Sequence, residues 1–348
     1  MITRRKLQIT MALTLLFAML MSTTVASAQS VTLGGSATFR DADGSALGSN
    51  NSLVLSLTDA PTLGVGYRYE GWLVGPGGTK VSVGTYNGPI DGTWVSPTNE
   101  NLAASYSQLL LTTEPVPDPD PATHGTVAFS ATIASGVIEP VRGLLTASGT
   151  TATGNGIAVA LHGEATIAAV HAAASQGSGV LGDLQSHAQH VSIVIDGLGT
   201  PGDGIGILAY AESAKVLAAA AKASEPGNKK VVAGADAAIA AANRIIDRAG
   251  IAKANVAALL AATSINASTE VASVNVTNMS NQMVASAAAL YAAAQDTVTF
   301  VPKDGPVVEA PSAGDQLVPM IAMLALVAGV ILTGGGLAML RRRGLAAA

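Results

Sequence analysis

The sequence predicts an α+β multidomain protein, with an N-terminal antiparallel β-sandwich, an alanine-rich helical bundle and one C-terminal transmembrane helix. Short Thr-rich and aromatic segments separated by turn residues fill residues 29–135, which is typical of a β-sandwich domain. Long alanine-rich segments fill residues 136–300 and indicate a helical bundle domain. An uncharged stretch, residues 317–340, is long enough to cross a bilayer as a helix.

Residues 1–28 have the parts of an export signal peptide. Arg4, Arg5 and Lys6 form a positive region, an apolar run follows, and a small-x-small pattern ends at Ala28. The apolar run is shorter than a membrane span, which favours cleavage after Ala28 over a retained N-terminal anchor. We therefore expect the protein to be exported.

The C-terminal stretch predicts a membrane anchor. Three arginines follow the uncharged residues 317–340 at once, in the short tail 341–348, and the positive-inside rule places that basic tail in the cytoplasm. Residues 301–316, rich in Pro, Val and acidic residues, are typical of an extended stalk linker. The predicted localisation is the cell membrane, single-pass, with the ectodomain on the extracytoplasmic side and the lipid bilayer as partner.

Composition excludes several classes of function. The chain has no cysteine, which excludes disulfides, thiol nucleophiles, zinc–thiolate sites and covalently bound c-type haem. Between residues 29 and 316 the chain carries 23 acidic against 12 basic residues, a net charge of −11. An acidic ectodomain argues against nucleic acid as a partner.

Seven short segments of the β region are expected to form strands. They are bounded by turn residues, as at Asp41–Gly44 and Gly75–Gly78. The predicted strands are residues 31–33, 37–39, 53–57, 69–74, 80–86, 109–114 and 126–130. The aromatic residues of this region are expected in the sandwich core rather than on a ligand platform; they are Tyr67, Tyr69, Trp72, Tyr86, Trp94 and Tyr106.

Part of the β region resembles a known family. The segments that carry the likeness are Tyr69–Val74, Gly78–Thr85, Leu111–Pro115 and Pro121–Gly125. They resemble the extracytoplasmic C-terminal domain of anti-sigma-K factors, where a "YxxWLV…G…SxG" hairpin and a "VTxEP…PTG" strand pair build a small sandwich. That family carries a cytosolic sigma-binding segment before its single span, whereas an export signal comes first here. The resemblance therefore implies the fold and not the regulation.

Six segments of the second region are expected to form helices that pack as antiparallel neighbours, because their connections are short. A break is expected at residues 225–228 and a softer one at Gly250. The predicted helices are residues 155–175, 180–198, 211–224, 229–249, 252–264 and 268–294.

The first helical hairpin holds the candidate site. Glu164 and His171 are seven residues apart and share one helix face. Asp183, His187 and His190 are spaced four and three residues apart and share a face of the next helix. If these faces meet, the five side chains would suit a transition metal, or a non-covalent haem held by two imidazoles. The alternative is that they are ordinary, partly exposed helix residues that hold no ligand.

A second resemblance concerns this hairpin. His171-Ala172, His187-Ala188-Gln189-His190 and the loop Pro201–Gly206 are similar to helical domains of uncharacterised bacterial surface proteins with "HAEH"-type helices. Gln189 stands where those proteins carry an acid. The glycine-rich loop lacks the lysine of a P-loop and the length of an EF-hand, so it predicts a tight turn between helices.

No complete catalytic signature is present, so we expect no enzyme activity. The predicted function is a membrane-anchored extracytoplasmic binding or structural surface protein. Two alternatives stay open: a metal- or haem-binding helical bundle that uses the hairpin histidines, and an envelope sensor related to anti-sigma regulators. The sensor would need an envelope protein partner to carry its signal inward.

Overall fold

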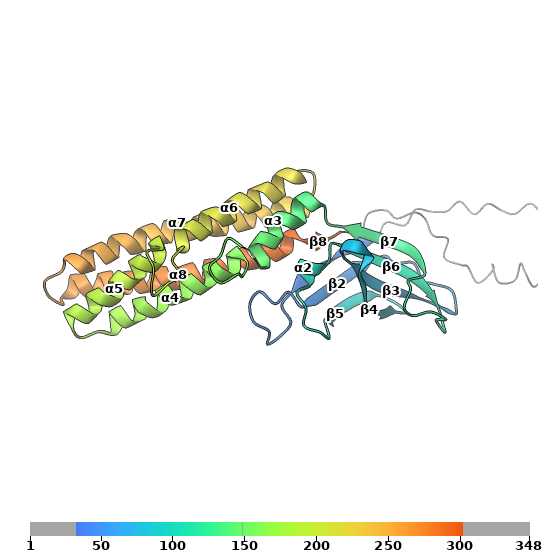
Figure 1. Cartoon of the computed structure of the whole chain (residues 1–348), viewed down its shortest axis with the longest axis horizontal. Helices are drawn as coiled ribbons and strands as arrows, with labels where there is room; N and C mark the ends of the chain where they lie inside the picture. The colour runs from blue at the N-terminus through green and yellow to red at the C-terminus, as the bar shows by residue number, and fades with distance from the viewer. Residues whose placement is uncertain (1–32, 148, 302–348) are drawn as a thin grey trace, which may run out of the picture. The chain divides into compact units, whose positions relative to one another are not determined.

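The computed structural model describes residues 33–147 and 149–301. The predicted signal peptide, transmembrane helix and basic tail, together with all of the predicted stalk except residue 301, lie outside the described residues. Within the described residues, the chain forms two four-stranded antiparallel sheets and a set of long helices, and all strands but the last precede the long helices in the sequence (Figure 1). The predicted α+β class is confirmed.

The first sheet has the strand order β5-β2-β1-β8. Its strands are β1 (Gly34–Arg40), β2 (Ser52–Thr58), β5 (Ile90–Val95) and β8 (Thr299–Phe300). Leu53, Leu55 and Leu57 of β2 are at most 3% exposed, whereas Val54 between them is 37% exposed. This period of two points one face of the sheet at the core.

The second sheet has the order β4-β3-β6-β7. Its strands are β3 (Tyr67–Val74), β4 (Lys80–Tyr86), β6 (Gln108–Pro115) and β7 (Thr126–Thr132). Leu73, Leu109 and Leu111 pack into the same core as the leucines of β2. A short 3₁₀ turn, η1 (Pro76–Gly78), joins β3 to β4, and a four-residue helix, α2 (Leu102–Ser105), precedes β6. Strands therefore form at all the predicted strand segments except residues 31–33, of which the structure describes only Leu33, just before β1.

The expectation that six aromatic residues fill the sandwich core is met in part. Tyr69 and Tyr106 are buried in the core, while Tyr67, Tyr86 and Trp94 are only half-buried. Trp72 is buried but lies on the opposite face of β3 from Leu73. There its Nε1 donates to Thr112 Oγ1 at 3.1 Å, and the Lys80 ammonium lies 5.2 Å from the centre of its ring.

Six longer helices follow β7, and they pack side by side with alanine at many of the contacts. Asn228 caps the first turn of α7 and Asn266 begins α8 with a capping box, the arrangement that satisfies free amide groups at a helix start. The helices are α3 (Ser135–Leu145), α4 (Ile157–Gly177), α5 (Leu181–Asp196), α6 (Ile207–Ser224), α7 (Lys229–Ala261) and α8 (Ala267–Thr297).

The prediction of a break at Gly250 is wrong, because α7 is a single helix of 33 residues that continues through Gly250. Gly250 lies on the exposed side of the helix, where a glycine costs only about 1 kcal/mol relative to alanine. On the buried side Ile245, Ala249, Ala252 and Val256 keep an unbroken helical spacing against the neighbouring helices. Their packing outweighs the local preference of one glycine.

The last strand returns the chain to the sandwich. β8 follows α8 and pairs with β1, although its residues lie in the range predicted as helical bundle. Its Phe300 is 1% exposed and meets the Phe39 ring edge-on, with ring centres 5.2 Å apart. The strand that completes the first sheet therefore lies near the opposite end of the described sequence from β1.

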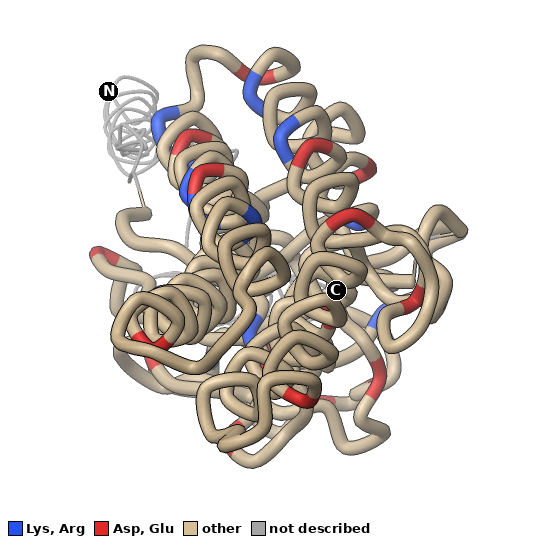
Figure 2. The backbone as a smooth tube through the Cα atoms, turned by 90° about the vertical axis from the view of Figure 1, so that its left-hand side faces the viewer, with Lys and Arg blue, Asp and Glu red and all other residues tan. Residues whose placement is uncertain are grey.

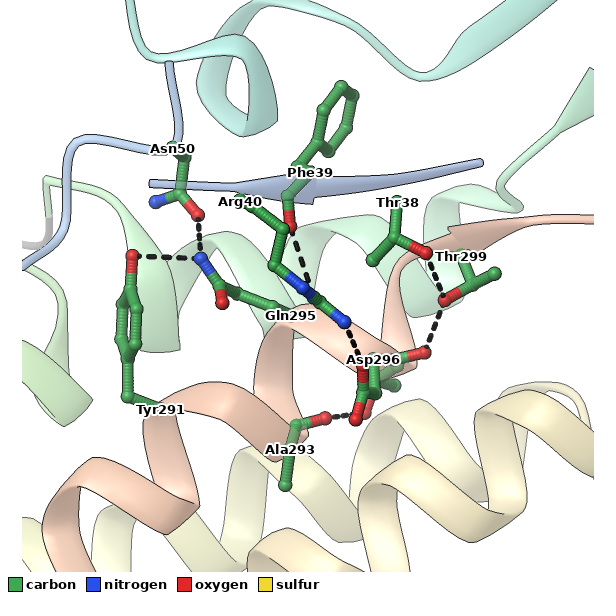
Figure 3. Close-up of polar contacts among 10 residues, drawn as sticks. Thr38, Phe39, Arg40, Asn50, Tyr291, Ala293, Gln295, Asp296 and Thr299 are labelled. Carbon is green, nitrogen blue, oxygen red and sulfur yellow. Dashed lines mark hydrogen bonds and ion pairs between the residues drawn. The ribbon is translucent and has the colours of Figure 1, made fainter. Parts of the chain in front are cut away.

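Polar contacts reinforce this junction between α8 and the first sheet (Figure 3). The Gln295 amide, 4% exposed, donates to Asn50 Oδ1 at 3.0 Å and to the Tyr291 hydroxyl at 3.1 Å. That hydroxyl donates in turn to the Asp41 carboxylate. Arg40 forms an ion pair with Asp296 at the exposed rim. A buried, satisfied network of this kind fixes a single arrangement of the groups that it joins.

Of the described helices, α4 is the one long and apolar enough to cross a membrane by length and composition, with a mean hydropathy of 1.4. The core helix of a soluble protein meets the same criteria. α4 packs against α5, α6 and α8, with Leu161, Ala165 and Ala168 fully buried. This packing accounts for its apolar composition.

Candidate metal centre

The hairpin of α4 and α5 brings the predicted faces together through small residues. Ala168 and Ala172 of α4 and Ala188 of α5 are fully buried, and alanine lets two helices approach closely. Ser175 Oγ also donates to the Leu184 carbonyl oxygen at 2.8 Å across the hairpin. Because the two helices lie close together, the longer side chains on this face come into contact.

His171, His187 and His190 form a cluster between these two helices. The Nδ1 atoms of His171 and His187 are 3.2 Å apart. The ring centres of His171 and His190 are 4.7 Å apart, and those of His187 and His190 are 6.0 Å apart. One nitrogen from each ring lies within 4.8 Å of the other two, and all three residues are half-buried. The three imidazoles can therefore reach one common point.

The cluster fits a metal ion with nitrogen ligands. Metal–nitrogen bonds of about 2.0–2.1 Å at tetrahedral angles place the donor atoms about 3.3–3.4 Å apart. The His171–His187 pair, at 3.2 Å, is close to that spacing, and His190 offers a nitrogen within 4.8 Å of both. Nδ1 of His190 is also buried without a hydrogen-bond partner among the described residues. Native proteins seldom leave such a group unpaired unless a ligand or water completes it.

Burial makes His171 suited to bind a metal at neutral pH. Its pKa is lowered, first by burial and then by the neighbouring imidazoles of His190 and His187. Neutral imidazole is the form that binds a metal, so the environment of His171 prepares it for this role. The 3.2 Å contact with His187 also requires at least one ring nitrogen to be unprotonated, because one of the pair must accept.

The structure does not bring Glu164 or Asp183 into the cluster. Glu164 lies on the same helix as His171, but seven residues separate them, about 10 Å along the axis. Its Oε1 accepts from the backbone N–H of Asp203 at 3.1 Å, so Glu164 holds the predicted tight turn between α5 and α6. Asp183 is exposed in the first turn of α5. His162 of α4 is not in the cluster either.

Glu164 is an uncompensated carboxylate inside the bundle. It is 4% exposed, and its Oε2 has no hydrogen-bond partner in the described part of the chain. The pKa of Glu164 is raised, first by burial and then by the charge of Asp203, against a smaller opposing effect of the Asp203 backbone hydrogen bond. Asp203 itself accepts hydrogen bonds from the Tyr210 hydroxyl and the Ile205 amide.

We expect Glu164→Gln to stabilise the protein at neutral pH by about 1–2 kcal/mol, because glutamine keeps the shape and removes a buried charge. The pKa of Glu164 is raised on folding from its ordinary value of 4.5. Its protonation therefore stabilises the folded state below about pH 4.5, and this stabilisation is lost as pH rises through the folded pKa. The variant should therefore gain on the wild type as pH increases from 4 to 7 in urea unfolding. A gain that does not change with pH would contradict this account.

A group of three carboxylates, two on strands of the second sheet and one in the connection after β6, was not predicted. Oxygens of Glu70, Glu114 and Asp118 lie within 4.8 Å of one another, and both glutamates are buried. Ser82 Oγ donates to Glu70, and the Gly125 amide donates to Glu114 Oε1 at 2.7 Å. The signal in the sequence is an acidic residue inside a predicted strand, at Glu70 and at Glu114. The pattern of one strand alone does not show which residues of other strands lie beside it.

Comparisons with known proteins bear on the identity of the chain. No family model, no curated protein and no solved structure matches it. The likeness to anti-sigma-K factors and the likeness to bacterial surface proteins with "HAEH"-type helices therefore stay predictions. A function has to be argued from the geometry of the chain itself.

Proposed function

We propose that this chain is a membrane-anchored extracytoplasmic protein that binds a divalent transition-metal ion through His171, His187 and His190. The observation that supports it most is the convergence of three half-buried imidazoles, from two helices, to within 4.8 Å. Two histidines at i, i+3 are common on helix surfaces, but here a third histidine from the neighbouring helix reaches the same point. The predicted export signal and anchor support the extracytoplasmic location.

The arrangement favours a bare ion over haem. A haem iron with two imidazole ligands needs the porphyrin plane between the two rings. The Nδ1 atoms of His171 and His187 are instead in direct contact at 3.2 Å, and the third ring lies 4.7 Å from His171. No space is left between the rings for a porphyrin, so the geometry favours a metal ion over haem.

The ligand set indicates the class of metal. Imidazole nitrogen suits zinc, copper and nickel, whereas magnesium and calcium prefer oxygen ligands. Three protein ligands leave a fourth position for water or for an external ligand. Glu164, the predicted acid on α4, is held by the loop at Asp203, and Asp183 is exposed in the first turn of α5. Among the described residues, neither predicted acid therefore joins the three imidazoles as a general base. We therefore propose metal binding without catalysis.

Calorimetric titration of the purified full-length protein in detergent, after chelation, tests the proposal. We expect one zinc or copper ion per chain and a loss of affinity of about 100-fold or more in His187→Ala, because two imidazoles cannot replace three. His162→Ala is the matched control, since it removes another half-buried histidine of the same hairpin from outside the cluster. If both variants bind like the wild type, or if the wild type binds no metal, the proposal fails.

The envelope-sensor alternative stays a prediction, because none of the contacts described above concerns a partner protein. The more general role as a binding or structural surface protein is compatible with the metal site. The predicted export signal and membrane anchor support that role as well.

A further inference from the structure

A cleft of about 430 Å³ opens at one end of the β-sandwich. The β2–β3 connection, residues 59–66, and the β4–β5 connection, residues 87–89, both cross from one sheet to the other at this end. The strand pairing places these two connections at the same end, since Leu57 of β2 pairs with Ile90 of β5 and Tyr69 of β3 pairs with Tyr86 of β4. Connections clustered at one end of a sandwich are a common place for binding sites.

Three tyrosine side chains line this cleft, and two of them are held by hydrogen bonds. Tyr67, Tyr69 and Tyr86 all contribute to its wall. The Tyr69 hydroxyl donates to the Pro61 carbonyl oxygen at 2.9 Å, and the Tyr86 hydroxyl donates to that of Val83 at 3.0 Å. These bonds hold both rings, so a ligand would not have to order them on binding. Rigid aromatic rings give large contact areas at a low cost in conformational entropy.

Polar groups with free bonding capacity complete the cleft. Asp59, Arg68 and Asn87 also line it. Thr58 Oγ1 donates to Asp59 Oδ2 at 2.9 Å, which orients this carboxylate. Asp59 adopts a left-handed backbone conformation with φ of 65°, which aspartate tolerates better than most other residues with a side chain. Within the described chain, the Asn87 and Tyr67 side chains make no hydrogen bond of their own.

We propose that this cleft binds a short oligosaccharide. A sugar ring has an apolar face that stacks on tyrosine and a rim of hydroxyls that bonds to carboxylate, amide and guanidinium groups. The lining carries one acidic and one basic side chain, which suits an uncharged ligand better than an ion. The volume is in the range of about 300–1,000 Å³ that is usual for small-ligand sites.

The sheet topology argues against an extended peptide as the ligand. Peptides that bind to sheets add a strand to a free edge. Five of the lining residues belong to the central strands β2 and β3, whose neighbours pair with them on both sides. The edge strands β4 and β5 also end here, but β4 contributes only Tyr86 and β5 contributes no lining residue, so the cleft offers side chains rather than a free strand edge.

The test is titration of the full-length protein in detergent with three soluble trisaccharides, of hexose, of N-acetylhexosamine and of hexuronic acid, and with an uncharged tripeptide. Calorimetry is expected to show binding of at least one uncharged trisaccharide at concentrations up to about 10 mM. Tyr67→Ala and Asn87→Ala should each weaken it by about tenfold or more. Tyr67→Phe keeps the ring and should retain most of the affinity.

The controls make each result decisive. Thermal unfolding of every variant shows whether the sandwich is still folded, which is expected because Asn87 is exposed and Tyr67 half-buried. Tyr106→Phe changes a tyrosine of the same domain outside the cleft and should bind like the wild type. The proposal is overturned if no uncharged trisaccharide binds, if the tripeptide or the uronic acid probe binds more tightly, or if folded Tyr67→Ala and Asn87→Ala bind normally.

Discussion

Phe300→Ala is expected to lower the free energy of unfolding by about 3–5 kcal/mol. Phe300 is 1% exposed, and its ring packs edge-on against Phe39 in the sandwich core. The loss of such a ring removes its burial and leaves a cavity that the surrounding strands can fill only in part. The effect should be large for a strand of two residues, because Phe300 anchors the end of the helical part to β1.

Urea unfolding of the full-length protein, followed by tryptophan fluorescence, measures this change. Val301→Ala is the matched control at the next position, where the side chain is 38% exposed. An exposed substitution of this kind should change stability by no more than about 0.5 kcal/mol. If Phe300→Ala is as mild as Val301→Ala, the return of the chain to the first sheet contributes little to stability.

The strands that could be predicted from the sequence were those with a strong local pattern. Lys80–Tyr86 alternates between two turn segments and forms β4 with those bounds. β5 was not predicted, because it contains Asp91 and Gly92, the latter at φ of 135°. Neither residue type favours a strand. β8 has only two residues, and what makes it a strand is its partner β1, which lies far away in the sequence.

Helices were predicted where alanine-rich spacing was long, and missed where local breakers dominated. α3 includes Gly136, Pro140 and Gly143, each of which disfavours a helix interior. Its Val137, Ile138, Val141 and Leu144 nevertheless share one buried face. The packing of that face outweighs the local preferences, as it does at Gly250 in α7. Local propensity is a weak guide wherever tertiary contacts are this extensive.

The same distinction applies to the candidate metal site. His187 and His190 could be placed on one face from their spacing, and His171 could be placed opposite them because a short turn makes α4 and α5 antiparallel. Glu164 shares the helix face of His171, but the loop before α6 folds back over it and offers the Asp203 amide. That contact depends on a segment 39 residues away, so helical spacing alone could not assign it.

Zinc is expected to stabilise the protein against urea at pH 7.5 and to lose this effect near pH 5. A ligand that binds only the folded state at 100 times its dissociation constant adds about 2.7 kcal/mol to the free energy of unfolding. The three imidazoles must be neutral to bind the ion, so protons compete with it as pH falls. The pKa of His171 is already lowered by burial and by the neighbouring histidines, which keeps this ligand neutral at pH 7.5.

The stability of the protein without zinc should also depend on pH. Because the pKa of His171 is lower in the folded state than its unfolded value of about 6.5, the unfolded chain takes up a proton first as pH falls. Stability without zinc should therefore decrease below pH 6.5, down to the folded pKa of His171. Urea titrations with and without zinc at both pH values separate the two effects. His187→Ala should lose the zinc response at pH 7.5, while His162→Ala should keep it; an equal response in both variants would show that zinc acts elsewhere on the chain.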